Sequence, residues 1–318
     1  MRTVTIRSED ELRGFSLTEK TAVAIGFFDG VHKAHRELIA KAREYSEEHG
    51  LSLAVFTFSS DTMLTKGAGR LYTDEEKCEL LAQIGADTAL LFDFGLIKDL
   101  SKEEFVNGIL SQKLNAEAVF CGDDFRFAKK ASANAEDLKA LMRALGKEAF
   151  AIGEITEDGE RISTSSIKAL LAEGKTEEAA KLLTVPYFIT GRVAHGKGMG
   201  RAMGIPTVNI DLPESSVGLP RGVYSTIVSV GEERYLGLTN VGTCPTFGER
   251  REHTETLILD FAGNLYDEKI RIYFLSYLRE EKTFSGAEEL VMQINVDKNK
   301  ALKLLGDLKW QEIGRSSR

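Results

Sequence analysis

The chain has 318 residues, and its 41 basic and 49 acidic side chains give a formal net charge of -8. This length allows two domains of ordinary size, and the acidic balance argues against a protein that binds duplex nucleic acid, which needs a basic face. No apolar run approaches the roughly 20 residues of a membrane span, and the N-terminal segment has no apolar stretch of the kind found in secretion signals. We therefore expect a cytoplasmic protein without nucleic-acid or membrane partners, present as a monomer or a weak homo-oligomer.

The first half of the chain predicts alternating strands and helices. Short apolar runs bounded by polar residues predict strands over 21–28, 51–58, 88–94 and 116–122. Apolar residues at helical spacing predict helices over 35–49, 74–84 and 101–114, the last opened by a capping box of Ser101 and Glu104. This alternation is typical of a Rossmann-like parallel sheet covered by helices. Ligands bind such sheets at the carboxyl ends of the strands.

The second half changes character near Val185 and Pro186, after a helical pattern over 166–183. Short runs rich in β-formers, separated by turn residues, predict strands over 187–194, 207–212, 222–230, 234–241, 255–261 and 269–278. They indicate an antiparallel barrel or sandwich. We place the domain boundary between residues 184 and 185, which gives domains 1–184 and 185–318.

A terminal amphipathic helix ends the pattern. Ser285 and Glu288 have the spacing of a capping box. The predicted apolar face, which we expect to cover the barrel, consists of Leu290, Val291, Ile294, Ala301 and Leu304.

The segment GFFDGVHKAH, residues 26–35, predicts a phosphate site in the first half. It follows the first predicted strand, and His32 and His35 lie three residues apart near the start of a helix, so they share one face. The exposed N–H groups of a helix N-terminus favour phosphate. Two imidazoles there can donate to phosphate oxygens and stabilise charge that builds at the α-phosphorus.

The segment GKGMGRAMGIPTVNI, residues 196–210, predicts a second phosphate site. Glycines allow the backbone to approach a phosphate, and basic side chains neutralise its charge. Thr207 and Asn209 are two apart on a predicted strand and therefore point to one face. Their hydroxyl and amide oxygens suit Mg²⁺. The candidate phosphate-binding residues are Gly196, Lys197, Gly198, Gly200 and Arg201.

Both segments resemble motifs of bacterial bifunctional FAD synthetases. In the first half the resemblance covers G-x-F-D-G-V-H-x-x-H, LYTDEEKCELLAQIGAD, LSKEEFVNGILSQKLNAEAVFCGDDFRF and ISTSSIKALLAEG. In the second half it covers PTVN, NVGTCPTF, ETLILDF and FLSYLREEKTF. It implies an HxGH-type nucleotidyltransferase domain followed by a β-barrel riboflavin kinase domain with a terminal helix. The implied reactions convert riboflavin and ATP to FMN and ADP, and FMN and ATP to FAD and pyrophosphate, both with Mg²⁺.

The resemblance also implies roles for single residues. In the first half, His32 and His35 would bind and stabilise the ATP phosphates. ATP would be held there by Gly26, Phe27, Asp29, Gly30, Ser163, Thr164, Ser165 and Lys168, and flavin by Asp124, Phe125 and Asn134. In the second half, Thr207 and Asn209 would hold Mg-ATP, and Glu255 would be the base that takes the proton of the ribityl 5′-hydroxyl. Arg279 and Phe284 would contact the flavin. Without the resemblance, the simpler interpretation of Glu255 is a solvated acidic residue near a turn.

Four features of the first half depart from the family pattern. Ala34 and Ala128 stand where the family has Gly, Lys168 stands for Arg, and Ser59-Ser60-Asp61-Thr62 replaces an acidic, Pro-bearing loop. Two alternatives to a bifunctional enzyme therefore stay open. In one, a single activity is retained, and this would be the riboflavin kinase. In the other, the chain is a flavin- or nucleotide-binding regulator without turnover.

Overall fold

The computed structural model describes residues 1–59, 69–195, 206–211, 216–246 and 249–306, without the side chains of 243–252. The chain divides into two compact units. Unit 1 consists of Met1–Lys66 and Tyr72–Thr164, and unit 2 of Gly67–Leu71 and Ser165–Arg318. No helix among the described residues is long and apolar enough to cross a membrane.

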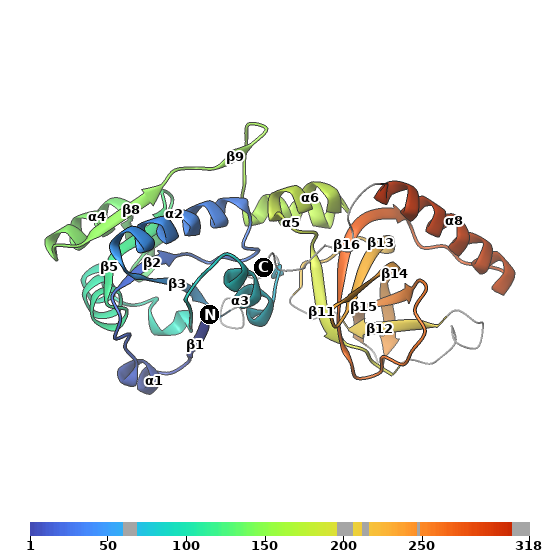
Figure 1. Ribbon diagram of the computed structural model, residues 1–318, viewed down its shortest axis with the longest axis horizontal. Helices are drawn as coiled ribbons and strands as arrows, with labels where there is room; N and C mark the ends of the chain where they lie inside the picture. The colour runs from blue at the N-terminus through green and yellow to red at the C-terminus, as the bar shows by residue number, and fades with distance from the viewer. Residues whose placement is uncertain (60–68, 196–205, 212–215, 247–248, 307–318) are drawn as a thin grey trace. The chain divides into compact units, whose positions relative to one another are not determined.

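Unit 1 is built on a six-stranded parallel sheet (Figure 1). Its strands are β1 (Arg2–Ile6), β2 (Thr21–Ile25), β3 (Ser52–Phe58), β4 (Thr88–Phe92), β5 (Ala116–Gly122) and β8 (Glu148–Ile152). They lie in the order β1-β4-β3-β2-β5-β8. β3 lies beside β2 and β4 beside β3, whereas the next strand, β5, lies on the other side of β2. The switch point, where such sheets bind ligands, therefore lies between β2 and β5.

Helices cover both faces of this sheet. The main helices are α2 (Lys33–His49), α3 (Asp74–Gln83), η2 (Glu104–Lys113) and α4 (Ala135–Ala144). The core cluster on one face joins Val23 and Ile25 of β2 to apolar residues of η2 and α4. Ala22 and Ala24 point to the other face and are also fully buried, where α2 packs on β2, β3 and β5. Burial on both faces explains why these strands read as continuous apolar runs.

The predicted elements of the first half are confirmed, with small differences at their ends. The first strand ends at Ile25 rather than Phe28, because residues 26–31 form the loop that enters α2. Ser101 and Glu104 form the predicted capping box. The helix behind it has π-type hydrogen bonds, such as that from Leu114 N–H to the carbonyl of Ile109 at 3.0 Å.

Several elements of unit 1 were not predicted from the sequence. These are β1, β8, α4 and the short elements α1 (Glu9–Gly14), η1 (Phe94–Leu96), β6 (Arg126–Phe127), η3 (Lys129–Ala131), β7 (Ala133–Asn134), β9 (Thr156–Glu157) and β10 (Glu160–Arg161). Elements of two or three residues are too short to give a periodic signal.

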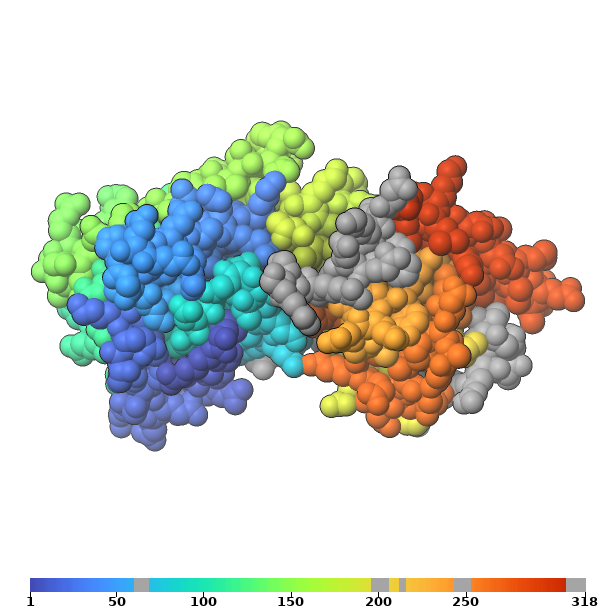
Figure 2. Space-filling model, viewed as in Figure 1, coloured from blue at the N-terminus to red at the C-terminus, as the bar shows by residue number. Residues whose placement is uncertain are grey.

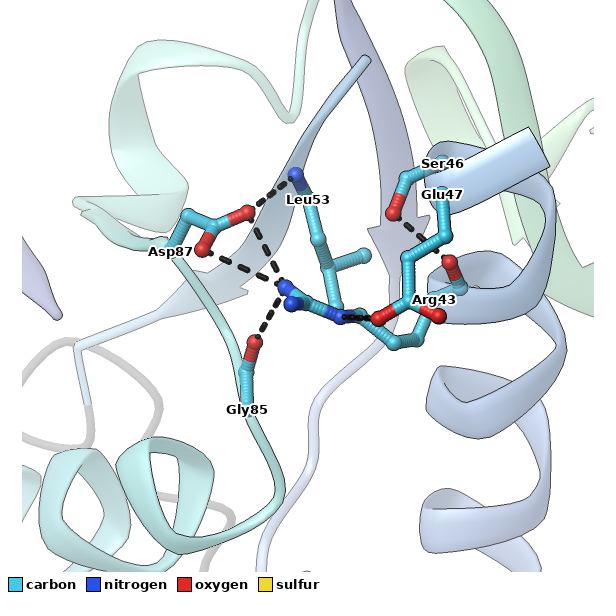
Figure 3. A network of polar contacts seen from close by, with 6 residues as sticks. All are labelled: Arg43, Ser46, Glu47, Leu53, Gly85 and Asp87. Carbon is cyan, nitrogen blue, oxygen red and sulfur yellow. Dashed lines mark hydrogen bonds and ion pairs between the residues drawn. The ribbon is translucent and has the colours of Figure 1, made fainter. Parts of the chain in front are cut away.

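A polar network fixes the end of α2 to the turn before β4 (Figure 3). Arg43 Nη1 donates to the carbonyl of Gly85 at 2.9 Å and to both carboxylate oxygens of Asp87 at 3.2 Å, and its Nε donates to Glu47 at 2.7 Å. Asp87 also accepts from the backbone N–H of Leu53 at 2.8 Å. One arginine thus joins α2 to the start of β3 and of β4.

Unit 2 is a nearly closed antiparallel barrel of six strands. The strands are β11 (Phe188–Arg192), β12 (Thr207–Asp211), β13 (Gly222–Val230), β14 (Glu233–Thr246), β15 (Glu249–Ile258) and β16 (Lys269–Arg279), in the order β11-β16-β13-β14-β15-β12. An isolated bridge between Ala194 and Asn209 joins the two ends of this order. The buried hydroxyls of Thr226, Thr239 and Thr256 satisfy one another at 2.9 Å across β13, β14 and β15.

Two helices precede the barrel strands in the chain, α5 (Thr164–Ala172) and α6 (Thr176–Leu183). A third, α8 (Ala287–Leu305), follows them. The helical pattern predicted over 166–183 is two helices, because Gly174 takes a left-handed φ of +76° between them. α6 packs against β16, and the Thr176 hydroxyl donates to the carbonyl of Leu275 at 2.8 Å.

The terminal helix covers the barrel as predicted, but two details of the prediction are wrong. Ser285 bonds to Glu289 instead of Glu288, because Gly286 is the N-cap and the helix begins one residue later than the pattern suggested. Val291 and Leu304 are exposed, whereas Ile294 and Ala301 pack on the barrel with Val223, Leu238 and Leu278. Figure 2 shows α8, in red, on the outside of the unit.

Candidate active sites

A cavity of about 830 Å³ opens in unit 1 at the carboxyl ends of β2 and β5. This is the switch point of the sheet, where the topology predicts a ligand. The loop after β2 contributes Gly26 and Phe27, and the loop after β5 contributes Asp124 and Phe125. Much of the lining is aromatic, which suits a large planar ligand.

The two predicted histidines meet at one wall of this cavity. His32 is the N-cap of α2, and its Nδ1 accepts from the backbone N–H of His35 at 3.4 Å. Their rings stack with centroids 3.6 Å apart, and both line the cavity. Because Nδ1 of His32 accepts, the proton of the neutral ring sits on Nε2, which can donate to a ligand.

Burial sets the charge state of this pair. Desolvation lowers the pKa of His32 to about 4, although Asp29 opposes the shift. The pKa of His35 lies well below its usual value, first because the ring is buried and then because of the charges of His32 and Lys77. Both rings are therefore neutral at neutral pH and act as hydrogen-bond donors rather than as cations.

The loop between β2 and α2 is held in an unusual backbone conformation. Phe28 and Val31 have φ of 48° and 43°, values that cost energy for residues with a Cβ, and Gly30 has φ of 96°. Both strained side chains are buried, and the hydroxyl of Thr57 donates to the carbonyl of Phe27 at 2.7 Å. Packing from β3 thus maintains the loop that brings the two histidines to the cavity.

The four residues that the resemblance assigns to ATP in the segment ISTSSIKALLAEG, residues 162–174, fall in both units. Ser163 and Thr164 line the cavity, and the Thr164 hydroxyl donates to the carbonyl of Asp29 at 3.0 Å. Ser165 and Lys168 fall in unit 2 and are not among the lining residues.

Of the residues assigned to flavin in the first half, Asp124 and Phe125 line the cavity, whereas Asn134 does not. Asn134 is the N-cap of α4, and its side-chain oxygen accepts from the N–H groups of Glu136 and Asp137 at 3.0 and 3.1 Å. Ala128, at a position where the resemblance implies glycine, lines the cavity. Its φ of 63° is strained for a residue that has a Cβ.

Two charged residues at or near the cavity, Lys77 and Arg161, were not predicted from the sequence. Lys77 is 4% exposed; its ammonium donates to the carbonyl of Phe58 at 2.6 Å and lies 3.6 Å from Asp74. Arg161 lines the cavity and pairs with Asp124. A lysine on a helix is ordinarily solvated, and an arginine in a charged loop is common, so neither position carried a signal.

In unit 2 three of the predicted kinase residues, Thr207, Asn209 and Glu255, lie on one face of the barrel wall with Asn240, which was not predicted. Asn209, Glu255 and Asn240 are register partners across β12, β15 and β14, so their side chains point the same way. The hydroxyl of Thr207 donates to Glu255 Oε1 at 2.7 Å. The strand order thus brings a hydroxyl, two amides and a carboxylate together from three strands.

Arg279 lies at the end of β16 and is held by the terminal helix. Its Nε and Nη2 donate to the carboxylate of Asp297 at 3.0 and 2.8 Å, and Asp297 is 3% exposed. The guanidinium carbon lies 5.9 Å from the ring centroid of Phe284. Asp297 could not be predicted from the sequence, because it lies 18 positions from its partner.

The glycine-rich segment predicted to bind phosphate lies outside the described residues. Gly196, Lys197, Gly198, Gly200 and Arg201 all belong to it. Ala194, which precedes the segment, pairs with Asn209.

Comparisons with known proteins match each unit to a flavin-related domain. The family model described as FAD synthetase matches residues 15–166, and that described as riboflavin kinase matches residues 183–305. The bifunctional riboflavin kinase/FMN adenylyltransferase of Bacillus subtilis (strain 168) is 33% identical over 301 residues, 91% of this chain and 94% of that protein. The protein of the same name from Escherichia coli (strain K12) is 31% identical over 294 residues, 91% and 94% of the two chains.

A solved structure is similar over nearly the whole length. The crystal structure described as a macrolide-efflux protein from Streptococcus pneumoniae matches with a TM-score of 0.85 and 26% sequence identity, covering 95% of this chain and 99% of that one.

The sheet with its switch-point cavity and the barrel with its polar row define a two-domain protein that joins a nucleotidyltransferase fold to a kinase-type barrel. The chain belongs to the family of bifunctional riboflavin kinases/FMN adenylyltransferases.

Proposed function

We propose that the two units carry out successive steps of flavin-cofactor synthesis. Unit 2 phosphorylates riboflavin with ATP to give FMN and ADP, and unit 1 adenylylates FMN with ATP to give FAD and pyrophosphate. Membership of the family and the position of the two family matches along the chain support this assignment. The substrates are then riboflavin, FMN and ATP, and the products FMN, FAD, ADP and pyrophosphate.

The contact between Thr207 and Glu255 is the observation that carries the kinase assignment. In the proposed reaction the ribityl 5′-hydroxyl attacks the γ-phosphorus of ATP while the carboxylate of Glu255 takes its proton, and ADP leaves. A positioned carboxylate beside a clamped triphosphate supplies most of what this reaction needs. Arg279, held by Asp297, and Phe284 are proposed to contact the flavin.

The adenylyl transfer is proposed to take place in the cavity of unit 1. A phosphate oxygen of FMN attacks the α-phosphorus of ATP, and pyrophosphate leaves. His32 and His35 donate to the phosphate oxygens from neutral rings, which stabilises the charge that develops there. Gly26, Ser163 and Thr164, which line the cavity, are proposed to hold ATP, together with Asp29, whose carbonyl accepts from Thr164. Asp124 and Phe125 are proposed to contact the flavin.

Mg²⁺ is the proposed metal ion of both steps. In unit 2 the Thr207 hydroxyl donates a hydrogen bond to Glu255, which leaves the lone pairs of its oxygen available to a metal ion. The Asn209 amide lies on the same face, so two hard oxygen ligands fit Mg²⁺. When bound, Mg²⁺ neutralises part of the triphosphate charge. Excess EDTA is expected to stop both reactions, and added Mg²⁺ to restore them.

Further proposals concern the molecule as a whole. They are a cytoplasmic location, the absence of nucleic-acid and membrane partners, and a monomeric or weakly homo-oligomeric state. The acidic net charge supports the second of these. The domain boundary at 184/185 is proposed on the change in sequence pattern and on the riboflavin kinase match, which begins at residue 183.

A flavin assay tests the proposed function. The protein is incubated with riboflavin, ATP and Mg²⁺, and the flavins are separated by chromatography. We expect both FMN and FAD. FMN alone would favour an enzyme that retains only the kinase, and flavin binding without turnover would favour a regulator.

Two substitutions separate the sites. Glu255→Gln is expected to reduce FMN formation by about 100-fold or more, because the base is lost, while FAD formation from added FMN persists. His32→Ala is expected to remove FAD formation alone. The matched controls are Glu268→Gln and His49→Ala, both at exposed positions. Kinase activity that survives Glu255→Gln would refute the assignment of the base.

A further inference from the structure

A second carboxylate lies on the face of unit 2 that carries Glu255. The side chain of Glu281, two residues beyond β16, folds back onto β14, where the Asn240 side-chain amide donates to its Oε1 at 3.1 Å. Asn240 is the register partner of Glu255. We propose that Glu281 recognises the polyol chain of the alcohol substrate, accepting hydrogen bonds from hydroxyls next to the one that is phosphorylated. This inference rests on the proposed kinase function of unit 2.

The strand register places the two carboxylates on the same side of the wall. Directly opposed residues of an antiparallel pair point to one face, so Asn240 and Glu255 do so. Gly242 is two residues beyond Asn240 and presents the same face. The Glu281 carboxylate, bonded to Asn240, therefore lies over β14, the strand next to the one that carries the proposed base.

Glycine at position 242 makes room for this arrangement. A Cβ on Gly242 would lie 2.8 Å from Glu281 Oε1 and 3.4 Å from Asn240 Nδ2. The backbone does not need glycine here, because Gly242 is not among the residues with positive φ. The absence of a side chain therefore serves the approach of the carboxylate rather than the conformation of the strand.

The carboxylate of Glu281 is held at one oxygen and accessible at the other. Asn240 fixes Oε1, and within the described part of the chain no hydrogen bond reaches Oε2. The side chain is exposed. An ionised carboxylate forms strong hydrogen bonds with hydroxyl donors, and the ribityl chain of riboflavin carries several hydroxyls in a row. The isoalloxazine ring offers no such array.

The test compares two flavins in one assay of riboflavin phosphorylation, in which the sum of FMN and FAD formed reports the activity of unit 2. The KM for riboflavin is measured together with the inhibition constant of lumiflavin, which has the same ring system with a methyl group in place of the ribityl chain. Glu281→Ala is expected to raise the KM for riboflavin roughly ten-fold, as the loss of a charge-assisted hydrogen bond implies, and to leave the inhibition constant of lumiflavin unchanged.

Two further variants complete the design. Gly242→Ala keeps the charge but places a Cβ 2.8 Å from Glu281 Oε1, so the carboxylate must shift. This variant is expected to show the same selective rise in KM. Glu280→Ala removes the neighbouring exposed carboxylate and serves as the control. Circular dichroism of each variant confirms the fold.

The outcomes distinguish this inference from the function on which it depends. If the wild-type protein forms FMN but Glu281→Ala changes both constants equally, or neither, recognition of the polyol by Glu281 is refuted and the kinase function stands. If the wild-type protein forms no FMN, both are refuted.

Discussion

The histidine pair shows how one residue changes chemistry with its surroundings. His32 and His35 are polar residues in a loop and helix start, where solvated and protonatable rings are the ordinary expectation. Burial at the cavity wall, where their rings stack 3.6 Å apart, instead keeps both neutral. Neutral rings donate to phosphate without the cost of desolvating a cation.

This depressed pKa predicts a pH-dependent stability. Below pH 6.5 the unfolded chain protonates His32 while the folded protein does not until about pH 4, so the free energy of unfolding falls as the pH drops through this window. Between pH 7 and pH 5 the loss attributable to His32 is about 2 kcal/mol. His32→Asn keeps an N-cap acceptor and should show a correspondingly smaller loss.

Urea unfolding followed by circular dichroism at the two pH values measures this difference. His49→Gln, an exposed histidine at the other end of α2, is the control and should behave as the wild type. An equal loss in the wild type and in His32→Asn would contradict the assigned cause.

At the residue scale, pairs of side chains could be predicted from the sequence where they depend on local spacing. His32 with His35, and Thr207 with Asn209, could be paired because three residues on a helix, and two on a strand, set a common face. Lys77, Asp297 and Glu281 could not be found in this way. Their partners lie on other elements, so only the packed chain brings them together.

At the scale of elements, the network around Arg43 joins α2 to the strands beneath it (Figure 3). Both side chains of its central pair are partly exposed, so solvent screening limits their Coulomb energy. The hydrogen bonds to backbone groups are less affected, because each one satisfies a carbonyl or an N–H at the end of an element.

We expect Asp87→Ala to lower the free energy of unfolding by about 1–2 kcal/mol, since the N–H of Leu53 loses its charged acceptor. Arg43→Ala should cost about 1 kcal/mol, and the double variant less than the sum of the two. Arg13→Ala, which breaks only highly exposed pairs on α1, should change stability by less than about 0.5 kcal/mol. Additive costs at Arg43 and Asp87 would show that the two side chains are not coupled.

The terminal helix illustrates why element boundaries and faces were harder to predict. The apolar pattern correctly predicted a helix that covers the barrel, but it also included Val291 and Leu304, which are exposed. The buried side of α8 instead contains Asp297, whose charge is matched by Arg279 of β16. A pattern that counts apolar residues cannot anticipate a buried ion pair, because the pairing residue comes from another element.

At the scale of the whole molecule, the position of α6 decides where unit 2 begins. Ala179 and Leu183 of α6 are fully buried, and Thr176 is bonded to the carbonyl of Leu275 in β16. The compact unit starts at Ser165, whereas the change in sequence pattern lies near Val185.

Two fragments test whether the foldable C-terminal domain begins at residue 165 or at residue 185. We expect the fragment 165–318 to be more stable than 185–318 by about 3 kcal/mol or more, because the shorter fragment leaves the surface under α6 exposed. Thermal unfolding by circular dichroism, together with FMN formation, measures the difference. Equal stability and activity of the two fragments would support the boundary at 184/185.

The sequence by itself determined the alternation of strands and helices in unit 1, the run of short strands in unit 2 and the two polar motifs, because each depends on neighbours within one element. The tertiary structure alone decided the strand orders, the cavity at the switch point and the neutral state of the histidines. It also decided the row that links Asn209, Glu255 and Asn240. These features depend on which distant segments pack together, and on how much water that packing removes.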